Sequence, residues 1–192
     1  MIFQFMRLHP KVTIKLLITD KHENIVEQHI DVAFRAGDSL ADSNLIARSY
    51  EELHIGYYAS PKYLEKYGTP EKPEDLNHHI MAGFRTPDGD VEHVIPIGSN
   101  DSFLQTPPRI TVNNITIMHS IAHNGEAIAV LVDETVEQEV ADGSLVRLFK
   151  NTPPHKAYIW VVYSSRHRLN AVTRTFLDFL FEKREEGVSL KD

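Results

Sequence analysis

The chain has 192 residues, no cysteine and a formal net charge of −7. This length fits one domain or two small lobes and is enough to bury a core without disulfides. The lack of cysteine excludes disulfides, zinc–thiolate sites and thiol nucleophiles. The acidic balance argues against direct DNA binding, because contacts to phosphate require a basic surface. No apolar run approaches the roughly 18 residues of a membrane span, and the first residues do not form a signal peptide, so we expect a cytoplasmic chain without membrane contact.

The first sixty residues predict one helix followed by strands. Residues 3–8 are typical of the end of a helix that stops before Pro10. Within residues 12–18, apolar Val12, Ile14, Leu16 and Ile18 alternate with polar positions, which predicts a strand. The further elements expected here are a short helical link at Glu23–Gln28, a strand at Asp31–Arg35 and a strand at Leu53–Ser60.

Proline and glycine mark the elements in the middle of the chain. Pro61 suits the first turn of a helix, where its missing N–H is not needed, and Gly68 suits a left-handed stop. We therefore expect a helix over Pro61–Tyr67. Pro87–Asp90 is typical of a hairpin turn. The strands expected here are His79–Phe84 and Val91–Ile97, on either side of that turn, and Arg109–Val112.

Asparagines predict the starts of two helices in the second half. Asn113 and Asn114 can cap a helix that ends at Gly125, and Asn170 can cap an amphipathic C-terminal helix. The elements expected between the two helices are strands at Ala127–Val132, Leu145–Phe149 and Tyr158–Tyr163, and an acidic amphipathic stretch at Asp133–Ala141. Strands and helices alternate at both ends of the chain around a hairpin, which indicates an α/β fold with two lobes.

A series of short blocks resembles one known family. The most distinctive block is YYASPKYL at Tyr57–Leu64, followed by YGTP at Tyr67–Pro70 and PEDL at Pro73–Leu76. The other blocks are, in chain order, Leu8–Val12, Ile30–Gly37, Asp42–Arg48, Val112–Asn114, Gly125 with Ile128 and Ala129, Asp142–Val146 and Phe176–Leu180. In order and spacing, these blocks resemble the effector-binding domain of LysR-type transcriptional regulators over nearly the whole chain.

The sequence departs from this family in two respects. The printed sequence has no counterpart of the winged helix-turn-helix and linker helix that precede the domain in the family, and we expect the first strand of the domain and part of the helix after it to be missing as well. That strand usually adds polar groups to the effector pocket. In addition, Glu126 and Val132 stand where the family more often has Gly and Pro.

The resemblance implies an α/β, two-lobed periplasmic-binding-protein-like fold (type 2), with mixed sheets flanked by helices and two crossover hinges. One lobe would comprise residues 1–54 and 159–192, and the other residues 55–158. A small-molecule effector, with a carboxylate as one option, would bind in the cleft between the lobes and shift the arrangement of lobes and dimer. The implied partners are a second copy, in a homodimer or higher homo-oligomer, and DNA, contacted only by the missing N-terminal domain.

We expect the effector site at strand ends and helix starts, because open α/β sheets bind ligands beyond the carboxyl ends of their strands and helix N-termini attract anions. The candidate residues are Thr19, Asp20, Arg35, Gly37, Ser60, Phe84, Asn113 and Asn114. Several also have a purely structural interpretation: Ser60 and Asn114 as plain N-caps, Arg35 as a salt-bridge partner, Gly37 as a turn glycine and Thr19 as a solvated strand end.

No metal, cofactor or catalytic site is expected. His119 and His123 have the i, i+4 spacing of some zinc sites, but no third ligand follows at a suitable distance, so an exposed or interface helix face is the better interpretation. The sequence has no nucleophile elbow, Gly-x-Gly-x-x-Gly loop or phosphate loop, which argues against an enzyme. The alternatives left open are a solute-binding protein for transport, a small enzyme on the same fold and a nonfunctional remnant.

Overall fold

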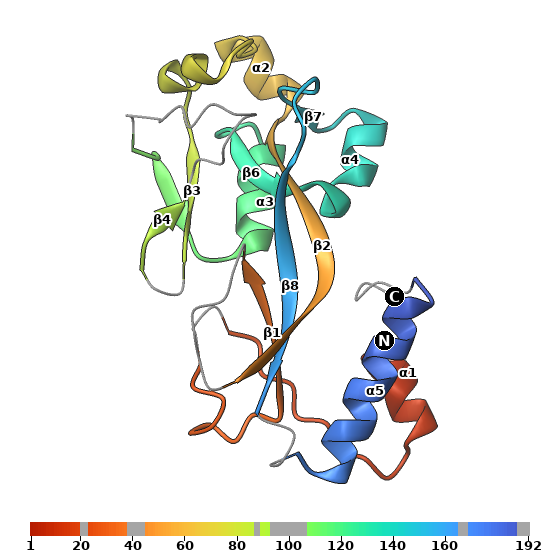
Figure 1. The fold of residues 1–192 in the computed structure, drawn as a ribbon. Helices are drawn as coiled ribbons and strands as arrows, with labels where there is room; N and C mark the ends of the chain where they lie inside the picture. Colours follow the sequence, from red (N-terminus) through yellow and green to blue (C-terminus); the bar gives the residue numbers. More distant parts are fainter. Residues whose placement is uncertain (20–22, 38–44, 87–88, 93–106, 165–168, 188–192) are drawn as a thin grey trace. The chain divides into compact units, whose positions relative to one another are not determined.

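The computed structural model describes residues 1–19, 23–37, 45–86, 89–92, 107–164 and 169–187 (Figure 1). These residues form two compact units. Unit 1 lies within residues 1–52 and 157–187, and unit 2 within residues 53–156. Two strands, β2 (Ile46–Ala59) and β8 (His155–Tyr163), run from one unit into the other.

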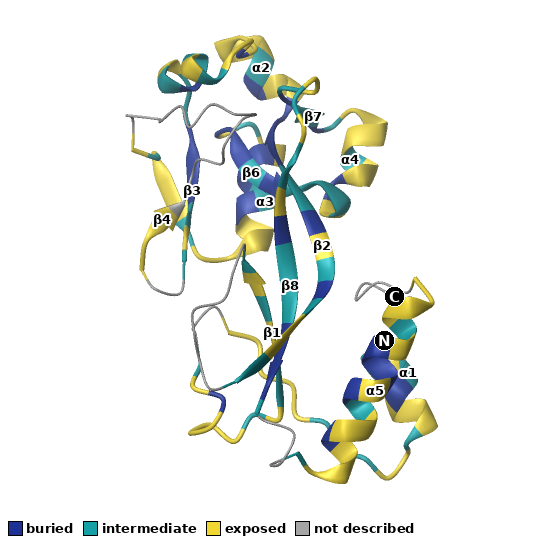
Figure 2. Cartoon of the chain, viewed as in Figure 1, coloured by how far each residue is buried: buried dark blue, intermediate teal, exposed yellow. Residues whose placement is uncertain are grey.

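Unit 1 combines two helices with antiparallel strands. Its elements are α1 (Ile2–Leu8), β1 (Val32–Gly37), the first half of β2, most of β8 and α5 (Ala171–Glu185). β1 pairs antiparallel with β8 along its whole length. α1 lies along α5 (Figure 1) because the buried Phe5 ring meets the edge of Phe176, with 4.9 Å between ring centroids. Figure 2 shows buried surface between these two helices and exposed surface on their outer sides.

Unit 2 contains the remaining elements. They are α2 (Pro61–Tyr67), η1 (Pro73–His78), β3 (Ala82–Arg85), β4 (Val91–Glu92), β5 (Ile110–Val112), α3 (Ile115–His123), β6 (Ala129–Val132), η2 (Asp133–Thr135), α4 (Glu137–Asp142) and β7 (Val146–Arg147). β3 pairs antiparallel with β4 and parallel with β5, which makes a mixed three-stranded sheet. The second half of β2 pairs antiparallel with β6 and β7. Met118, Ile121 and Ala122 bury the inner face of α3 against β3 and β6.

Three helices begin where their capping residues predict. The side chains of Ser60, Asn114 and Asn170 each accept a hydrogen bond from the backbone N–H three residues later. Gly68 ends α2 as predicted, but its φ of 83° and ψ of 168° are not the predicted left-handed helical conformation; only glycine adopts such a conformation without steric cost. The three N-cap predictions are confirmed because capping depends only on residues close in sequence.

The strand predicted at residues 12–18 is wrong, since this segment is extended but does not pair with another strand among the described residues. Val12 and Ile14 pack against the core of unit 1, which accounts for part of the alternation. Leu16 and Ile18, however, are 67% and 86% exposed. Alternation reports one buried face, whereas a strand also needs a hydrogen-bonded neighbour, and the described residues provide none at this segment.

The helix predicted at residues 23–28 is also wrong, because a turn over residues 25–29 takes its place. Asn24 Oδ1 accepts hydrogen bonds from the N–H groups of Val26 and Glu27, at 3.1 and 3.3 Å. The chain then reverses at His29, with φ 52°. Asparagine side chains compete in this way with continued helix formation.

Some predicted strands are shorter in the structure. β3 begins at Ala82, because η1 occupies the chain up to His78 and His79 caps it. β7 retains two of the five residues predicted. In the predicted strand Val91–Ile97, only 91 and 92 form β4, and residues 93–97 lie outside the described residues.

Candidate functional site

Unit 2 contains a polar cluster where η2 meets β2 and β7. Asp133, the first residue of η2, accepts a hydrogen bond from the Tyr58 hydroxyl at 2.8 Å and lies 3.2 Å from Arg147 Nη2. Burial, together with the hydrogen bond and charge of Asp133, raises the pKa of Tyr58, so this hydroxyl stays protonated and donating at neutral pH. Since Tyr58 pairs with Arg147 across the β2–β7 ladder, the cluster joins three elements.

Gly56 makes room for this ion pair. A Cβ atom at residue 56 would lie 2.9 Å from both Arg147 Nε and Asp133 Oδ1, closer than real Cβ contacts. Glycine therefore lets these charged side chains approach the backbone closely, and any larger residue at position 56 would force Arg147 or Asp133 to shift.

The neighbouring carboxylate, Glu134, binds β2 two residues before Gly56. Glu134 accepts a hydrogen bond from the His54 backbone N–H at 3.2 Å, and its Oε1 lies 2.7 Å from His54 Nδ1. Burial raises the pKa of Glu134, but hydrogen bonds from its own backbone and from His54 outweigh burial and lower the pKa overall. Two adjacent carboxylates thus hold residues 54–58 of β2 within unit 2.

Sequence reasoning missed this cluster because its hydrogen bonds to β2 join residues that are 75 and 80 positions apart in the chain. One local signal was available. Gly56 stands inside an otherwise apolar and aromatic strand, and an isolated glycine in a strand indicates a bulge or a close approach of other atoms.

Two predicted site residues of unit 2, Ser60 and Asn114, lie at opposite ends of α3. A side chain added at Gly125, just beyond α3, would meet Ser60 Oγ at 3.0 Å, so Ser60 lies near the C-terminal end of that helix. Asn114 is the N-cap of the same helix. Nine helical residues rise about 13 Å, so the structure does not bring these two caps together.

The other predicted residues of unit 2 are also separate. Phe84, on β3, is half-buried against the core formed by Met118 and Ile121. Asn113 is exposed just before α3. Phe84 is thus an apolar residue of the core surface, whereas Asn113 faces solvent.

In unit 1, the predicted residues Arg35 and Gly37 lie two positions apart on β1. Arg35 Nη2 donates a hydrogen bond to the Glu23 carbonyl at 3.0 Å, and the Gly37 carbonyl accepts one from Trp160 Nε1 at 3.1 Å. Thr19 is exposed at the end of the extended segment. Asp20 lies outside the described residues. Arg35 has no carboxylate partner among the described residues, so the predicted salt bridge is not seen there.

A shallow hollow of about 370 Å³ lies on the outer side of α3. Its lining residues are Lys62, Ile117, Ser120, Ile121, Asn124 and Glu126. Lys62 Nζ donates a hydrogen bond to the Asn124 carbonyl at 3.1 Å, which joins the start of α2 to the end of α3. This hollow could not be predicted from the sequence, because its two sides are 62 residues apart.

The His119–His123 pair has a structural partner. The two rings stack with 6.1 Å between centroids, and His119 Nε2 lies 3.1 Å from Glu139 Oε1 on α4. Within the described ranges, no group of three or more His, Asp or Glu side chains is arranged to hold a metal ion. His119 therefore connects α3 to α4 through its contact with Glu139, and His123 stacks on His119. Nor does any helix in those ranges combine the length and apolar character of a membrane span.

Two α/β units that share the strands β2 and β8 define the class of two-lobed, periplasmic-binding-protein-like domains, to which the regulatory domains among the matching solved structures also belong. Residues 1–185 match the family model described as the LysR substrate binding domain. The chain belongs to this family. The predicted family and fold class are therefore confirmed.

Similar proteins are transcriptional regulators. The chain is 32% identical over 181 residues to the HTH-type transcriptional regulator CrgA of Neisseria meningitidis, covering 94% of this chain and 60% of that protein. The CrgA regulatory domain gives a TM-score of 0.73 at 27% identity, over 95% of this chain and 89% of that domain. Full-length AphB of Vibrio cholerae shows the same fold, with a TM-score of 0.75 at 23% identity, over 94% of this chain and 61% of AphB.

Proposed function

We propose that this chain is the effector-binding and dimerisation domain of a LysR-type transcriptional regulator that acts in the cytoplasm. The match of residues 1–185 to the LysR substrate binding domain carries the proposal. The chain spans about 60% of CrgA, so DNA would be contacted by a separate domain. The net charge of −7 agrees with this division, because phosphate repels an acidic surface. The similarity to regulators favours this role over solute transport and over catalysis.

In this role, a small-molecule effector binds in the cleft between two lobes, residues 1–54 with 159–192 and residues 55–158. Binding shifts the population between lobe arrangements, and the shift changes the dimer and its DNA-binding domains. The effector must therefore bind one arrangement more tightly than the other.

We propose a carboxylate effector, and each lobe offers one candidate group for it. Arg35 supplies a guanidinium whose charge no described carboxylate neutralises. Ser60 supplies a buried hydroxyl that accepts from the Tyr63 N–H at 3.3 Å and has no acceptor for its own hydrogen among the described residues. Of the other candidates, Thr19, Asp20 and Gly37 belong to the first lobe and Phe84, Asn113 and Asn114 to the second.

A thermal-shift screen with benzoate, succinate and related aromatic and aliphatic acids tests this function. Ligands that bind only the folded state raise the melting temperature, and the shift grows with the logarithm of the ligand concentration once the site is nearly saturated. We expect at least one acid to do so for the wild type, and Arg35→Gln to lose the shift. Arg174→Gln, which changes an exposed arginine on α5, is the matched control and should keep it. A panel in which no acid moves the wild-type melting temperature contradicts the proposal.

Self-association as a homodimer is part of the proposal. Several large apolar side chains of unit 1 are exposed, among them Phe3 at 77% and Ile18 at 86%. Apolar surface of this kind commonly marks contacts between proteins. Light scattering during size-exclusion chromatography measures the mass directly, and a monomer at every concentration would exclude dimerisation by this chain alone.

A further inference from the structure

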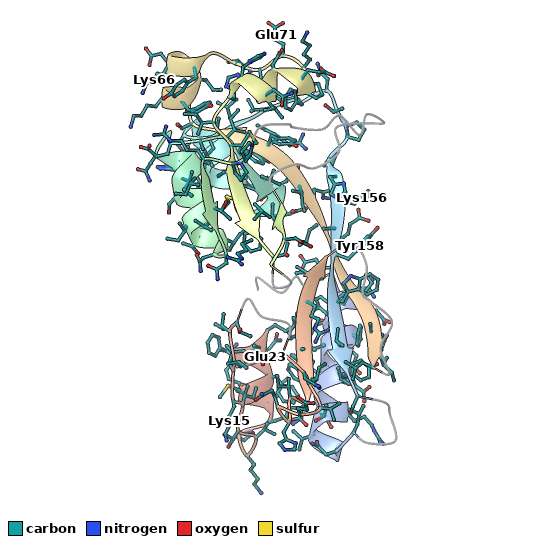
Figure 3. The ribbon with its side chains drawn as sticks, turned by 90° about the vertical axis from the view of Figure 1, so that its left-hand side faces the viewer. Lys15, Glu23, Lys66, Glu71, Lys156 and Tyr158 are labelled. Atoms are coloured by element: carbon teal, nitrogen blue, oxygen red, sulfur yellow. The ribbon has the colours of Figure 1, made fainter. Side chains whose placement is uncertain are left out.

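One face of the β1–β8 ladder brings an arginine beside two aromatic rings. β1 and β8 pair antiparallel, with Arg35 opposite Trp160 and Gly37 opposite Tyr158. Residues directly opposite each other in such a ladder have their side chains on the same face of the sheet. Tyr158 accordingly lies beside the end of β1 (Figure 3), and the centroids of the Tyr158 and Trp160 rings are 5.9 Å apart. All four residues belong to unit 1.

The neighbours of Arg35 on this face of β1 are small. Since side chains alternate between the two faces of a strand, the residues on either side of Arg35 are Ala33 and Gly37. They contribute one methyl group and no side chain, so β1 itself does not crowd the guanidinium. Arg35 Nη2 donates a hydrogen bond to the Glu23 carbonyl at 3.0 Å, and no carboxylate pairs with Arg35 among the described residues. A guanidinium in this position can bind a ligand carboxylate through two parallel hydrogen bonds.

The ring of Trp160 is held by its polar edge. Trp160 Nε1 donates a hydrogen bond to the Gly37 carbonyl at 3.1 Å, so the protein itself satisfies the one polar atom of the indole. Trp160 and Tyr158 are both half-buried, so each keeps some ring surface that the described residues do not cover. Aromatic pairs attract each other in offset and edge-to-face arrangements beyond the effect of buried area. An aromatic ligand therefore gains more from these two rings than an aliphatic ligand of the same size.

Charges of opposite sign lie on the two sides of the ring pair. β8 lies between β1 and β2 in the sheet. On the β2 side, the Tyr158 hydroxyl donates a hydrogen bond to Glu52 Oε2 at 3.4 Å, whereas Arg35 lies on the β1 side. A ligand carboxylate is repelled by Glu52 and attracted by Arg35. The charges thus favour one orientation, with the carboxylate at β1 and the rest of the ligand along the rings.

We propose that the effector is an aromatic carboxylate, whose carboxylate binds Arg35 and whose ring packs against Trp160 and Tyr158. Trp160 then determines the preference for aromatic over aliphatic acids. This inference rests on the proposed carboxylate effector and adds the chemical class of the rest of the ligand. Neither ring was expected in the site, because aromatic residues in a predicted buried strand are typical of a core.

Fluorescence of the full chain locates the ligand without any substitution. Trp160 is the only tryptophan, so the intrinsic tryptophan emission reports on this position alone. The electron-poor ring of para-nitrobenzoate quenches indole emission on contact. We expect saturable quenching, with the same dissociation constant as the thermal shift gives for this compound, and we expect benzoate to reverse the quenching by competition. N-acetyltryptophanamide in the same solutions corrects for collisional quenching, which does not saturate.

Two acids of equal charge and similar size isolate the contribution of the aromatic ring. In thermal-shift titrations, the wild type should bind benzoate about fivefold or more tightly than cyclohexanecarboxylate. Trp160→Leu should remove most of this preference, and Trp160→Phe should retain it. Tyr67→Leu, at a ring on α2 that is 41% exposed, is the matched control and should leave the preference unchanged. Each variant is compared with its own melting temperature without ligand, so a loss of stability is not counted as a loss of binding.

The inference and the proposed function fail separately. Equal affinity for the two acids overturns the inference and leaves a carboxylate effector standing. Saturable binding of para-nitrobenzoate that does not change the Trp160 emission has the same meaning, as does a melting temperature raised only by aliphatic acids such as succinate. A panel in which no acid raises the melting temperature overturns both the inference and the carboxylate effector.

Discussion

Arg147 Nη2 lies 3.2 Å from Asp133 Oδ2, and the ion pair passes directly over the backbone of Gly56. Gly56→Ala should therefore destabilise the chain by about 1–3 kcal/mol, because the new Cβ has no room. Urea unfolding with and without Arg147→Ala measures the coupling. Removal of the arginine creates space, so the double variant should cost less than the sum of the two single changes. Additive costs would contradict the steric explanation.

The lowered pKa of Glu134 gives a pH dependence of definite sign. Its pKa in the folded state lies below the unfolded value of 4.5, so the unfolded state binds the proton more readily. The stabilisation is complete above the unfolded pKa and is lost as the pH falls through the folded pKa. Glu134→Gln should thus flatten the dependence of the unfolding free energy between pH 6 and pH 3. Glu137→Gln, at an exposed position on α4, is the control and should preserve it.

Tyr63 connects α2 to the chain that leads into β3. Its fully buried side chain accepts a hydrogen bond from the Ile80 N–H at 2.8 Å through the hydroxyl oxygen. Tyr63→Phe leaves that amide without its partner and should cost about 1–3 kcal/mol by urea unfolding. Tyr67→Phe, at a ring that is 41% exposed, should cost less than about 0.5 kcal/mol. If Tyr63→Phe lowers the unfolding free energy no more than Tyr67→Phe, the buried hydrogen bond makes no net contribution to stability.

Asn170 caps α5 through a 2.8 Å hydrogen bond from the Thr173 N–H to Oδ1. Asn170→Ala should lower the unfolding free energy by about 1 kcal/mol, because one N-terminal amide of the helix loses its acceptor. Asn170→Ser retains a capping oxygen and should recover most of the loss in the same thermal or urea measurement. If serine is no better than alanine, the contact from Asn170 Nδ2 to Asp31, rather than the cap, is the source of stability.

The sequence predicted best what is decided locally. The starts of α2, α3 and α5 follow from Ser60, Asn114 and Asn170, whose partners are three residues away. It failed at residues 12–18, where the outcome depends on whether another strand is present. Alternation of apolar and polar residues indicates that one face of the segment is buried. It does not show whether a second strand lies beside the segment to form hydrogen bonds with it.

The candidate site was harder to predict for the same reason. Ser60 and Asn114 were both selected as helix starts, and only the packing at Gly125 shows that they lie at opposite ends of α3. The contacts of Asp133 with Tyr58 and of Glu134 with His54 join residues far apart in the chain. Spacing alone cannot indicate such pairs, although Gly56 marked the place where the ion pair of Asp133 with Arg147 approaches the backbone.

The course of β2 has a consequence for how this chain tolerates change. Ile46–Glu52 belongs to unit 1 and Leu53–Ala59 to unit 2, within one uninterrupted strand of 14 residues. A one-residue insertion or deletion in a strand exchanges its inward and outward faces. Such an event near Glu52 would set the two halves out of phase, so that one unit would have to fold with its apolar face turned to water. Length variation in evolution should therefore avoid β2, and neither unit can be redesigned at this strand without regard to the other.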